Sequence, residues 1–268
     1  MSFNIRGAFH TQDGLNAWEN RAALNVATIQ RHSPDLIGFQ ELQSGNLSVY
    51  EAELRDYQCI LGNEASGGTE HPSIFWKPTR FDLLEAGGFW LSETPEVYSG
   101  SWGTDNIRAA TWARFREKPS GKTFVHFNTH LDNVSAEARS EGLRLILQRM
   151  ADVGANLPTI LTGDFNCNAY QPPREGETDC ADANYRFLLE SGFVDSYLAA
   201  GNEDLAQSNT FHGFDGEQCV NENGRIDWIL MRDGVERLRV LSANIIHDHA
   251  APLYPSDHYP IVADVAIG

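Results

Sequence analysis

The chain alternates short apolar runs with amphipathic stretches along its whole length, and this alternation is the feature that most restricts its fold. Apolar runs bounded by Gly, Pro, Asn or Asp predict β-strands at 2–6, 36–40, 73–77, 81–85, 123–129, 159–163, 225–231 and 261–265. Mixed strands and helices without a break in composition predict one layered α/β domain over residues 1–268, with sheets inside and helices outside.

Two longer stretches, 14–32 and 135–153, predict helices that each bury one apolar stripe. The stripes consist of Leu15, Trp18, Ala22, Val26 and Ile29 in the first helix and of Leu143, Ile146 and Met150 in the second. Ser135 is a suitable N-cap for the second helix. The polar, Gly-rich stretches 168–182 and 200–224 predict the two longest loops.

The charge balance disfavours one class of partner. With 37 acidic and 20 basic residues, the formal net charge is -17, which repels polyanions and disfavours nonspecific binding to duplex nucleic acid. One basic strip, formed by Arg108, Arg114, Arg116, Lys118 and Lys122, is expected to be a solvated strand edge. A chain with 41% hydrophobic residues can bury a substantial core, so disorder is excluded.

No apolar run approaches the length of a membrane span, and the N-terminus lacks the layout of a signal peptide. We therefore expect a cytoplasmic protein without stable membrane association or an evident obligate protein partner. Because Met1 leads directly into a predicted strand, a leader could precede it. Four scattered cysteines lack zinc-like spacing and fit a reducing compartment. The "HDH" at 247–249 lacks the paired spacing of a zinc site.

Polar side chains that can bind a hard metal ion or a phosphate lie at several predicted strand ends. They are Asn4, Glu41, His130, Asp164, Asn166 and Asp227, followed by Asp257 and His258 in "YPSDHYP". A sheet positions such groups rigidly while they face the loops, which suits a functional site. Each one alone has an ordinary alternative, since "GDFN" favours a turn and the prolines beside Asp257 and His258 end strands.

These side chains fall into two groups that together suggest metal-dependent hydrolysis of a phosphate ester. Glu41, with Asn4 or Asp257, is the sparse oxygen set that Mg²⁺ accepts, and Mn²⁺ is an alternative. The metal would neutralise the charge of the phosphate and orient the ester.

The second set would carry the proton chemistry. Asp164 would orient and deprotonate the attacking water, and Asn166 could bind a phosphoryl oxygen. Strand alternation in "RIDWIL" places Asp227 on a face with apolar residues, so its carboxylate is expected to be buried and to need a partner. His258 would be that partner, and would stabilise charge on the phosphate.

Six motifs in order resemble the endonuclease/exonuclease/phosphatase superfamily. They are "SFNIR", "IGFQELQ", "FNTHLDN", "LTGDFN", "RIDWIL" and "SDHYPIVADV", and they run nearly from end to end. Other stretches, including "EHPSIFW" and "RAATWARF", resemble a compact bacterial subset. The resemblance implies a four-layer DNase I-like α/β sandwich, with two mixed sheets packed face to face, and divalent-metal-dependent phosphoester cleavage.

The resemblance also implies roles for particular residues. The implied catalytic set is Asp164, Asn166, His258, Asp227 and His130, and the implied metal set is Glu41, Asn4 and Asp257. Glu70 would support His130, Arg108 would contact the substrate, and His71, which replaces a common tyrosine, would alter the substrate pocket.

Three functions are consistent with these residues. The leading one is a phosphoesterase acting on a phosphomonoester or phosphodiester, and the acidic composition slightly favours a small phosphorylated metabolite. An endonuclease, exonuclease or deadenylase acting on nucleic acid is the alternative on the same fold. A non-catalytic binding scaffold would be indicated by loss of Glu41, Asp164 or His258, but all three are retained.

Overall fold

Two six-stranded sheets form the centre of the protein. The structure is a computed structural model that describes residues 1–62, 71–169, 182–205, 207–219 and 224–268. The first sheet has the order β11 (Leu238–Ile245), β12 (Ile261–Ile267), β1 (Ser2–Asn4), β2 (Leu36–Leu42), β4 (His71–Trp76) and β3 (Gln58–Ile60). The second has the order β5 (Phe81–Trp90), β6 (Ala109–Glu117), β7 (Thr123–His130), β8 (Thr159–Asp164), β10 (Asp227–Arg232) and β9 (Val194–Asp195).

Both sheets are mixed. In the first, β1 is parallel to β2 and antiparallel to β12. In the second, β7 is parallel to β8, and β8 is antiparallel to β10. Parallel neighbours end at the same edge of a sheet, so this topology gathers the carboxyl ends of β1, β2, β7 and β8 at one end of the molecule.

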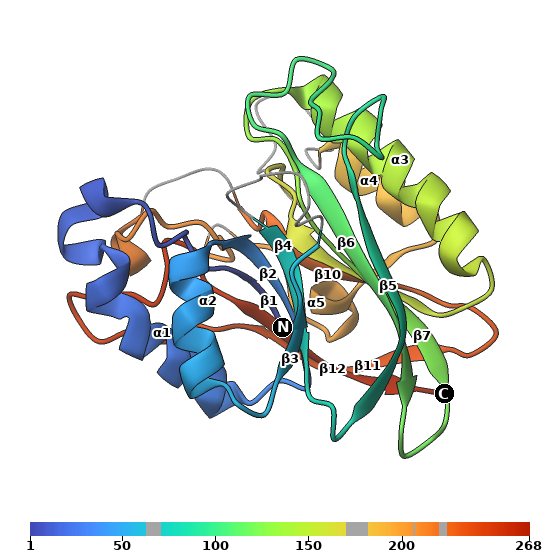
Figure 1. The fold of residues 1–268 in the computed structure, drawn as a ribbon, viewed down its shortest axis with the longest axis horizontal. Coiled ribbons are helices and arrows are strands. Elements are labelled where there is room, and N and C mark those ends of the chain that lie inside the picture. The colour runs from blue at the N-terminus through green and yellow to red at the C-terminus, as the bar shows by residue number, and fades with distance from the viewer. Residues whose placement is uncertain (63–70, 170–181, 206, 220–223) are drawn as a thin grey trace.

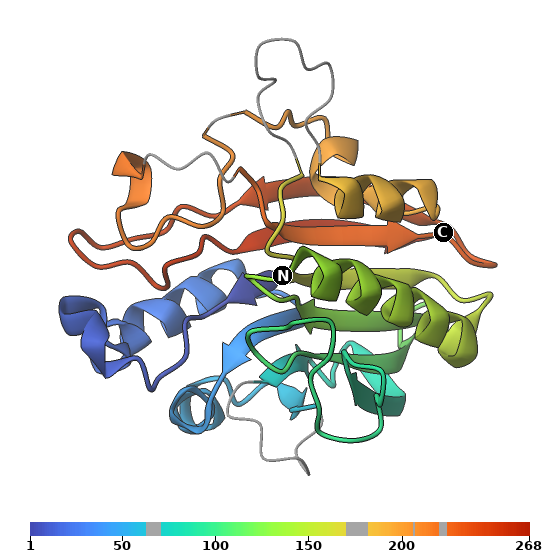
Figure 2. The same cartoon turned by 90° about the horizontal axis from the view of Figure 1, so that it is seen from above.

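Helices cover the outer faces of the two sheets (Figures 1 and 2). A short 3-10 helix, η1 (Thr11–Asn16), leads into α1 (Trp18–His32), which lies with α2 (Ser44–Glu53) over the first sheet. Helices α3 (Ala136–Gly154) and α4 (Ala183–Glu190) cover the second sheet, and α5 (Ser196–Ala199) and a second 3-10 helix, η3 (Gly216–Gln218), are short. The four-layer sandwich expected from the resemblance is therefore confirmed.

Three apolar clusters match the three interfaces between these layers. One lies between the first sheet and its helices, around Phe3, Phe39 and Tyr50. Another lies between the second sheet and its helices and contains Trp228. The third, around Phe115, lies between the two sheets. Each sheet therefore buries apolar side chains on both of its faces.

The two sheets approach closely where Gly38 of β2 faces Asn128 of β7. A Cβ atom on Gly38 would lie 2.5 Å from Asn128 Oδ1 and 2.2 Å from Thr162 Oγ1. The Asn128 side chain donates a hydrogen bond to Phe39 O (2.7 Å) and accepts from Gln40 Nε2 (2.7 Å) and Thr162 Oγ1 (2.9 Å). A satisfied buried amide of this kind fixes how the two sheets face each other.

The sequence patterns missed several elements. Strands β3, β6, β9 and β11 and helices α2, α4 and α5 were not predicted, and β5 runs to Trp90 rather than to residue 85. The first predicted helix splits at Ala17, so Leu15 belongs to η1 and is 58% exposed rather than buried. The predicted loop at 168–182 lies largely outside the described residues.

The basic strip also differs from the expected strand edge. Strand β6 lies inside its sheet, between β5 and β7. Arg114 pairs with Glu85 (3.1 Å), and Arg116 pairs with Asp82 (2.8 Å), which also contacts Lys118 (3.3 Å). These cations are neutralised by carboxylates on β5 and do not form a basic track. Within the described ranges, every helix is too short or too polar to span a bilayer.

Candidate active site

The register of the second sheet places three predicted site residues in one row. His130 is the last residue of β7, and it lies beside Asp164, the last residue of β8. Asp164 in turn lies opposite Asp227, the first residue of β10. Adjacent strands point paired residues to the same face, so these side chains converge. They face the first sheet, whose strand β1 ends at Asn4.

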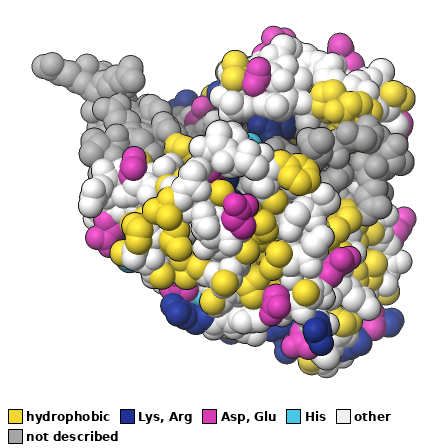
Figure 3. All heavy atoms as spheres, turned by 60° about the vertical axis from the view of Figure 1, so that its left-hand side comes forward, with side chains coloured by type: hydrophobic (Ala, Val, Ile, Leu, Met, Phe, Trp, Pro, Cys, Tyr) yellow, Lys and Arg dark blue, Asp and Glu magenta, His cyan; other side chains and the backbone are white. Residues whose placement is uncertain are grey.

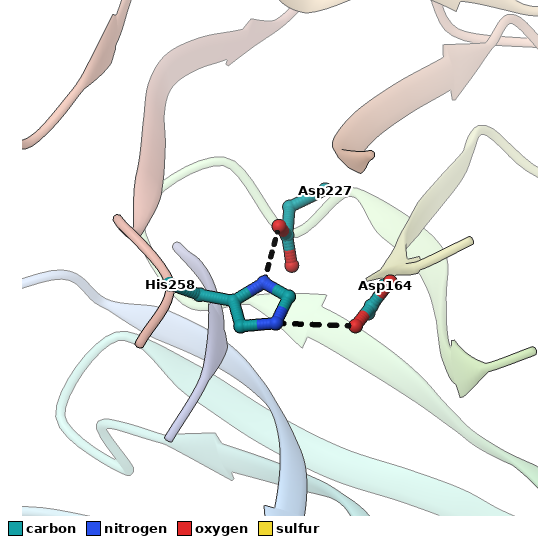
Figure 4. Close-up of side chains that lie close together, drawn as sticks. All are labelled: Asp164, Asp227 and His258. Atoms are coloured by element: carbon teal, nitrogen blue, oxygen red, sulfur yellow. Dashed lines mark hydrogen bonds and ion pairs between the residues drawn. The ribbon is translucent and has the colours of Figure 1, made fainter. Parts of the chain in front are cut away.

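His258 lies between the two aspartates (Figure 4). Its Nδ1 is 2.8 Å from Asp227 Oδ2, and its Nε2 is 3.7 Å from Asp164 Oδ2. All three residues are buried, and Asp227 is only 1% exposed. The buried carboxylate and imidazole partner expected for Asp227 are therefore present.

Burial and the charge of Asp227 shift the pKa values of both Asp164 and His258. Burial and the charge of Asp227 raise the pKa of Asp164 to about 7, against the opposing effects of His258 and Asn4. Burial lowers the pKa of His258, but the charge and hydrogen bond of Asp227 outweigh it and raise that pKa to about 10. At neutral pH, Asp164 can accept a proton, while His258 is a cation.

Asn4 joins the two sheets across the site. Its Nδ2 donates to Asp164 Oδ2 (2.9 Å) and to Glu41 Oε1 (3.0 Å). Both N–H groups of the amide are therefore committed to carboxylates from different sheets. Asn4 is 1% exposed, so it orients the two acids from within the sandwich.

Glu41 reaches the site through an irregular backbone. The pairing of β2 with β4 shifts register between Phe39 and Leu42, and Glu41 within this bulge has a φ of 62°. A positive φ is costly for a residue with a side chain and is typical of functional positions. Burial raises the pKa of Glu41, but interactions with His10, His130 and Asn4 outweigh it, so this pKa lies well below its ordinary value.

Asp257 provides a further buried carboxylate beside Glu41. Burial, together with the charge of Glu41, raises the pKa of Asp257 against the opposing charges of His258 and Arg6. Ser256 Oγ holds the turn by donating to Asn4 O (2.7 Å), and it lies 3.2 Å from Asp257 Oδ1. The carboxylates of half-buried Glu41 and buried Asp257 raise each other's energy, and with the amide oxygen of Asn4 nearby they form an oxygen donor set suited to Mg²⁺ or Mn²⁺.

A second group of donors could also hold a cation. Single ligand atoms of Asp164, Asp227 and His258 lie within 4.8 Å of one another. In the described residues, Asp227 Oδ1 is buried without a hydrogen-bond partner. Because His258 already donates to Asp227, the set around Glu41 is the simpler fit for a hard cation.

Asn166 lies just beyond Asp164, with a φ of 48°. Its backbone N–H donates to Asp164 Oδ1 (2.9 Å), which fixes that carboxylate from the side of the loop. Its side chain donates one N–H to Leu131 O (2.9 Å), and an amide nitrogen carries a second N–H. The residue therefore borders the buried cluster rather than joining it.

His130 and Arg108 form the other side of the site. Arg108 Nη1 is 3.0 Å from His130 Nδ1, and His130 Nε2 is 3.4 Å from Asp164 Oδ2. Burial and the positive charge of Arg108 hold the pKa of His130 well below its ordinary value. Of the remaining predicted residues, His71 begins β4, and Glu70 lies outside the described residues.

Two residues that hold the site together were missed in the sequence. Arg21 is fully buried on α1 and donates to Ile5 O (2.8 Å) and Pro255 O (2.9 Å), which links the end of β1 to the "YPSDHYP" turn. Thr210 Oγ1 accepts from the backbone N–H of Asp227 (3.1 Å). An arginine three residues after Trp18, on the buried face of a helix, was the signal for the first, and a lone threonine in a loop gave none.

Two other features have structural roles. Cys167 is buried in the cluster beneath α3, so it fills space there. His247 and His249 pack against Tyr259 and Tyr254, with ring centroids 4.5 and 5.2 Å apart.

Comparison with known proteins agrees with this geometry. A structure from Bacteroides vulgatus, described as an endonuclease/exonuclease/phosphatase, has a TM-score of 0.85 and 30% identity, and the match covers 100% of this chain and 97% of that one. A Bacteroides thetaiotaomicron structure described as a mannosyl-6-phosphatase has a TM-score of 0.85 and 29% identity over 99% and 98% of the two chains.

Similarity extends to longer proteins. Drosophila melanogaster nocturnin is 25% identical over 92% of this chain but only 42% of its own length. The chain spans at most about two thirds of the length of the curated relatives that it matches first. The sequence profile of the Endonuclease/Exonuclease/phosphatase family matches residues 1–258. With that profile covering nearly the whole sequence, the chain belongs to the endonuclease/exonuclease/phosphatase family, whose members are hydrolases.

Proposed function

We propose that this protein is a divalent-metal-dependent phosphoesterase that hydrolyses a small phosphomonoester. The convergence of Asp164, Asp227 and His258 in one buried cluster, linked by Asn4 to Glu41, is the observation that carries this proposal. Burying several ionisable groups together costs stability, and such clusters are typical of functional sites, so this arrangement favours a catalytic role over a purely structural one.

Glu41, Asn4 and Asp257 would hold Mg²⁺ or Mn²⁺, which supplies charge neutralisation at the phosphate when bound. The chain's own residues provide the rest of the reaction. Asp164 orients a water molecule and takes its proton, since its pKa of about 7 suits a base at neutral pH.

His258 provides a positive N–H donor at the phosphoryl group. Asp227 accepts a hydrogen bond from Nδ1–H of His258. The second N–H of the ring, at Nε2, is then directed into the cluster, 3.7 Å from Asp164 Oδ2. A cation held in this position stabilises the charge that develops on the phosphoryl oxygens. The second N–H of Asn166 is the donor for another of these oxygens.

Two observations favour a small substrate. The relative described as a mannosyl-6-phosphatase covers this chain almost completely, which supports a sugar phosphate as the first class to test. On the face drawn in Figure 3, acidic side chains are scattered over the described surface and basic ones gather mainly at its lower edge, so they form no continuous track for a polyanion.

A substrate panel tests the proposal directly. Mannose 6-phosphate, other sugar phosphates, inositol phosphates, bis-(p-nitrophenyl) phosphate and single-stranded oligonucleotides would each be assayed with Mg²⁺, Mn²⁺ and EDTA. We expect phosphate release from a sugar phosphate with either metal and none with EDTA. Cleavage of oligonucleotides alone would overturn the substrate class.

Asp164→Asn serves as the control for contaminating phosphatases, because it keeps the size of the side chain and removes the base. Activity that survives both EDTA and Asp164→Asn would show that this site is not the catalyst. A folded protein that hydrolyses nothing in the panel and binds Mg²⁺ normally would favour the binding-scaffold alternative.

A further inference from the structure

We propose that Arg108 is a positioning residue that fixes His130 as a neutral imidazole with its Nε2–H directed at the reacting phosphate. The inference rests on the proposed function for its consequence, but its geometry stands alone. A guanidinium has only donors, so the contact of 3.0 Å between Arg108 Nη1 and His130 Nδ1 requires Nδ1 to be an acceptor. The ring proton must then reside on Nε2.

The direction of Nε2 gives this tautomer a use. His130 Nε2 lies 3.4 Å from Asp164 Oδ2, on the side of the site where the attacking water and the phosphate would meet. An N–H in this place donates to a phosphoryl oxygen without adding a second imidazolium beside His258. The opposite tautomer would direct a lone pair at Asp164 and at the phosphate, and both contacts would be repulsive.

Arg108 is itself held in place from the neighbouring loop. Its Nη2 donates to Asn133 Oδ1 (3.2 Å), so the guanidinium spans from Asn133 to His130. The buried Asp132 ties together the two segments that carry these residues. Its Oδ2 accepts from the backbone N–H of Asn106 (3.2 Å), and its Oδ1 accepts from the backbone N–H of Ser135 (2.6 Å).

The two histidines of the site are therefore set in opposite ways. The carboxylate of Asp227 accepts a hydrogen bond from Nδ1–H of His258, whereas the guanidinium of Arg108 donates a hydrogen bond to Nδ1 of His130. The first arrangement favours an imidazolium and the second a neutral ring. One histidine can thus supply charge, and the other can supply a directed N–H.

Nitrogen NMR tests the tautomer without any substrate. Two-bond ¹H–¹⁵N spectra of histidine-labelled protein would be recorded with Mg²⁺, with the His130 signals assigned by their loss in His130→Gln. We expect the wild-type ring to carry its proton on Nε2. In Arg108→Met, the Nδ1–H tautomer or the imidazolium should appear. A wild-type proton on Nδ1, or an unchanged ring in Arg108→Met, overturns the inference.

Kinetics on the sugar phosphate separate positioning from direct contact. For Arg108→Met we expect kcat to fall by about 10- to 100-fold with a smaller change in KM, as for other residues that orient a catalytic ligand. Arg108→Lys, which keeps a donor, should recover part of the loss, and Asn133→Ala should show a weaker effect in the same direction. A raised KM with unchanged kcat would instead make Arg108 a substrate contact and would overturn the inference.

Matched variants complete the test. Arg116→Met, which removes an exposed arginine from the neighbouring strand β6, should leave both the spectrum and kcat unchanged. If Glu70→Gln shifts the His130 tautomer while Arg108→Met does not, a carboxylate orients the ring, and the inference fails. Because the spectrum needs no turnover, failure of the tautomer and failure of the phosphoesterase proposal can be told apart.

Discussion

The inward face of β7 connects two very different regions of the sandwich. Alternate residues Phe124, His126, Asn128 and His130 lie along this face. His130 lies in the candidate active site. Four residues earlier, His126 borders a cavity of about 640 Å³ that both sheets line at the opposite end. The same residue type on one strand therefore has two separate environments.

The difference lies in the partners. Both ring nitrogens of His130 contact polar groups, Arg108 and Asp164. His126 Nε2 is 2.8 Å from Thr162 Oγ1, but its Nδ1 is buried without a hydrogen-bond partner in the described part of the chain. The strand pairing at the cavity end is also incomplete. Strand β12 pairs along its length with β11, but its pairing with β1 is confined to Ile261. Polar groups at the site end are held by one another, and the cavity end is loosely packed.

The largest effect should separate the chemistry of the two ends. Asp164→Asn should lower kcat/KM by about 10³-fold or more, because the general base is lost while the side chain keeps its size. Asp264→Asn, at the exposed edge of the cavity end, should leave kcat/KM unchanged. Steady-state phosphate release measures both. Equal losses in the two variants would mean that the buried cluster is not the reaction centre.

A second variant tests whether the site end depends on a buried cation for its shape. Arg21→Met removes the donors to Ile5 O and Pro255 O and leaves these carbonyls buried. We expect roughly 3 kcal/mol or more to be lost from the free energy of unfolding, and activity to fall with it. Arg31→Met on the exposed side of the same helix is the control, with a change below about 1 kcal/mol in urea denaturation. Similar losses of unfolding free energy in the two variants would mean that the hydrogen bonds of Arg21 do not hold the site together.

The middle of the sandwich offers a third test, because Gly38 permits the close approach of the two sheets. Gly38→Ala should cost about 2–3 kcal/mol, since the added methyl would overlap Asn128 and Thr162, which are fixed in a hydrogen-bonded network. Gly154→Ala, where the nearest atoms are methyl groups of Leu157 and Val125 at 3.1 Å and where alanine favours the helix, should change stability by less than about 1 kcal/mol. Urea unfolding compares the two variants. A Gly38→Ala variant as stable as the wild type would mean that the two sheets can move apart far enough to accommodate a methyl group.

These comparisons indicate which parts of the molecule could be predicted from sequence. Ordered motifs at strand ends predicted the layers and the positions of Asn4, Asp164, Asp227 and His258, because strand ends are readable from apolar runs and turn residues. Strand β6 was missed, since its arginines resembled a solvated edge, and only tertiary ion pairs explain them. Local patterns carry no information about partners so far apart in the chain.

Other features depended on geometry that residue type does not encode. The bulge that gives Glu41 a positive φ arises from the pairing of β2 with β4, not from a glycine. Likewise, "FNTH" provides Asn128 and His130 as successive inward residues. The facing sheet makes the first a structural amide, whereas the neighbouring Asp164 of β8 makes the second a site residue. His126 gave no signal of its own, because a histidine in a strand can be buried or exposed.

The smallest predicted effect concerns His126 and is a dependence of stability on pH. Burial lowers the pKa of His126 to about 3 in the folded protein, whereas the unfolded side chain titrates near 6.5. Between these values the unfolded state binds a proton that the folded state does not, so stability should fall as pH falls below about 6.5. His126→Phe abolishes this titration. Relative to the variant, the wild type should lose about 2 kcal/mol between pH 7.5 and pH 5 in urea denaturation. Parallel pH profiles for the two proteins would show that the cavity admits water to His126, and the contrast with the closely partnered His130 would then be one of solvation rather than of missing partners.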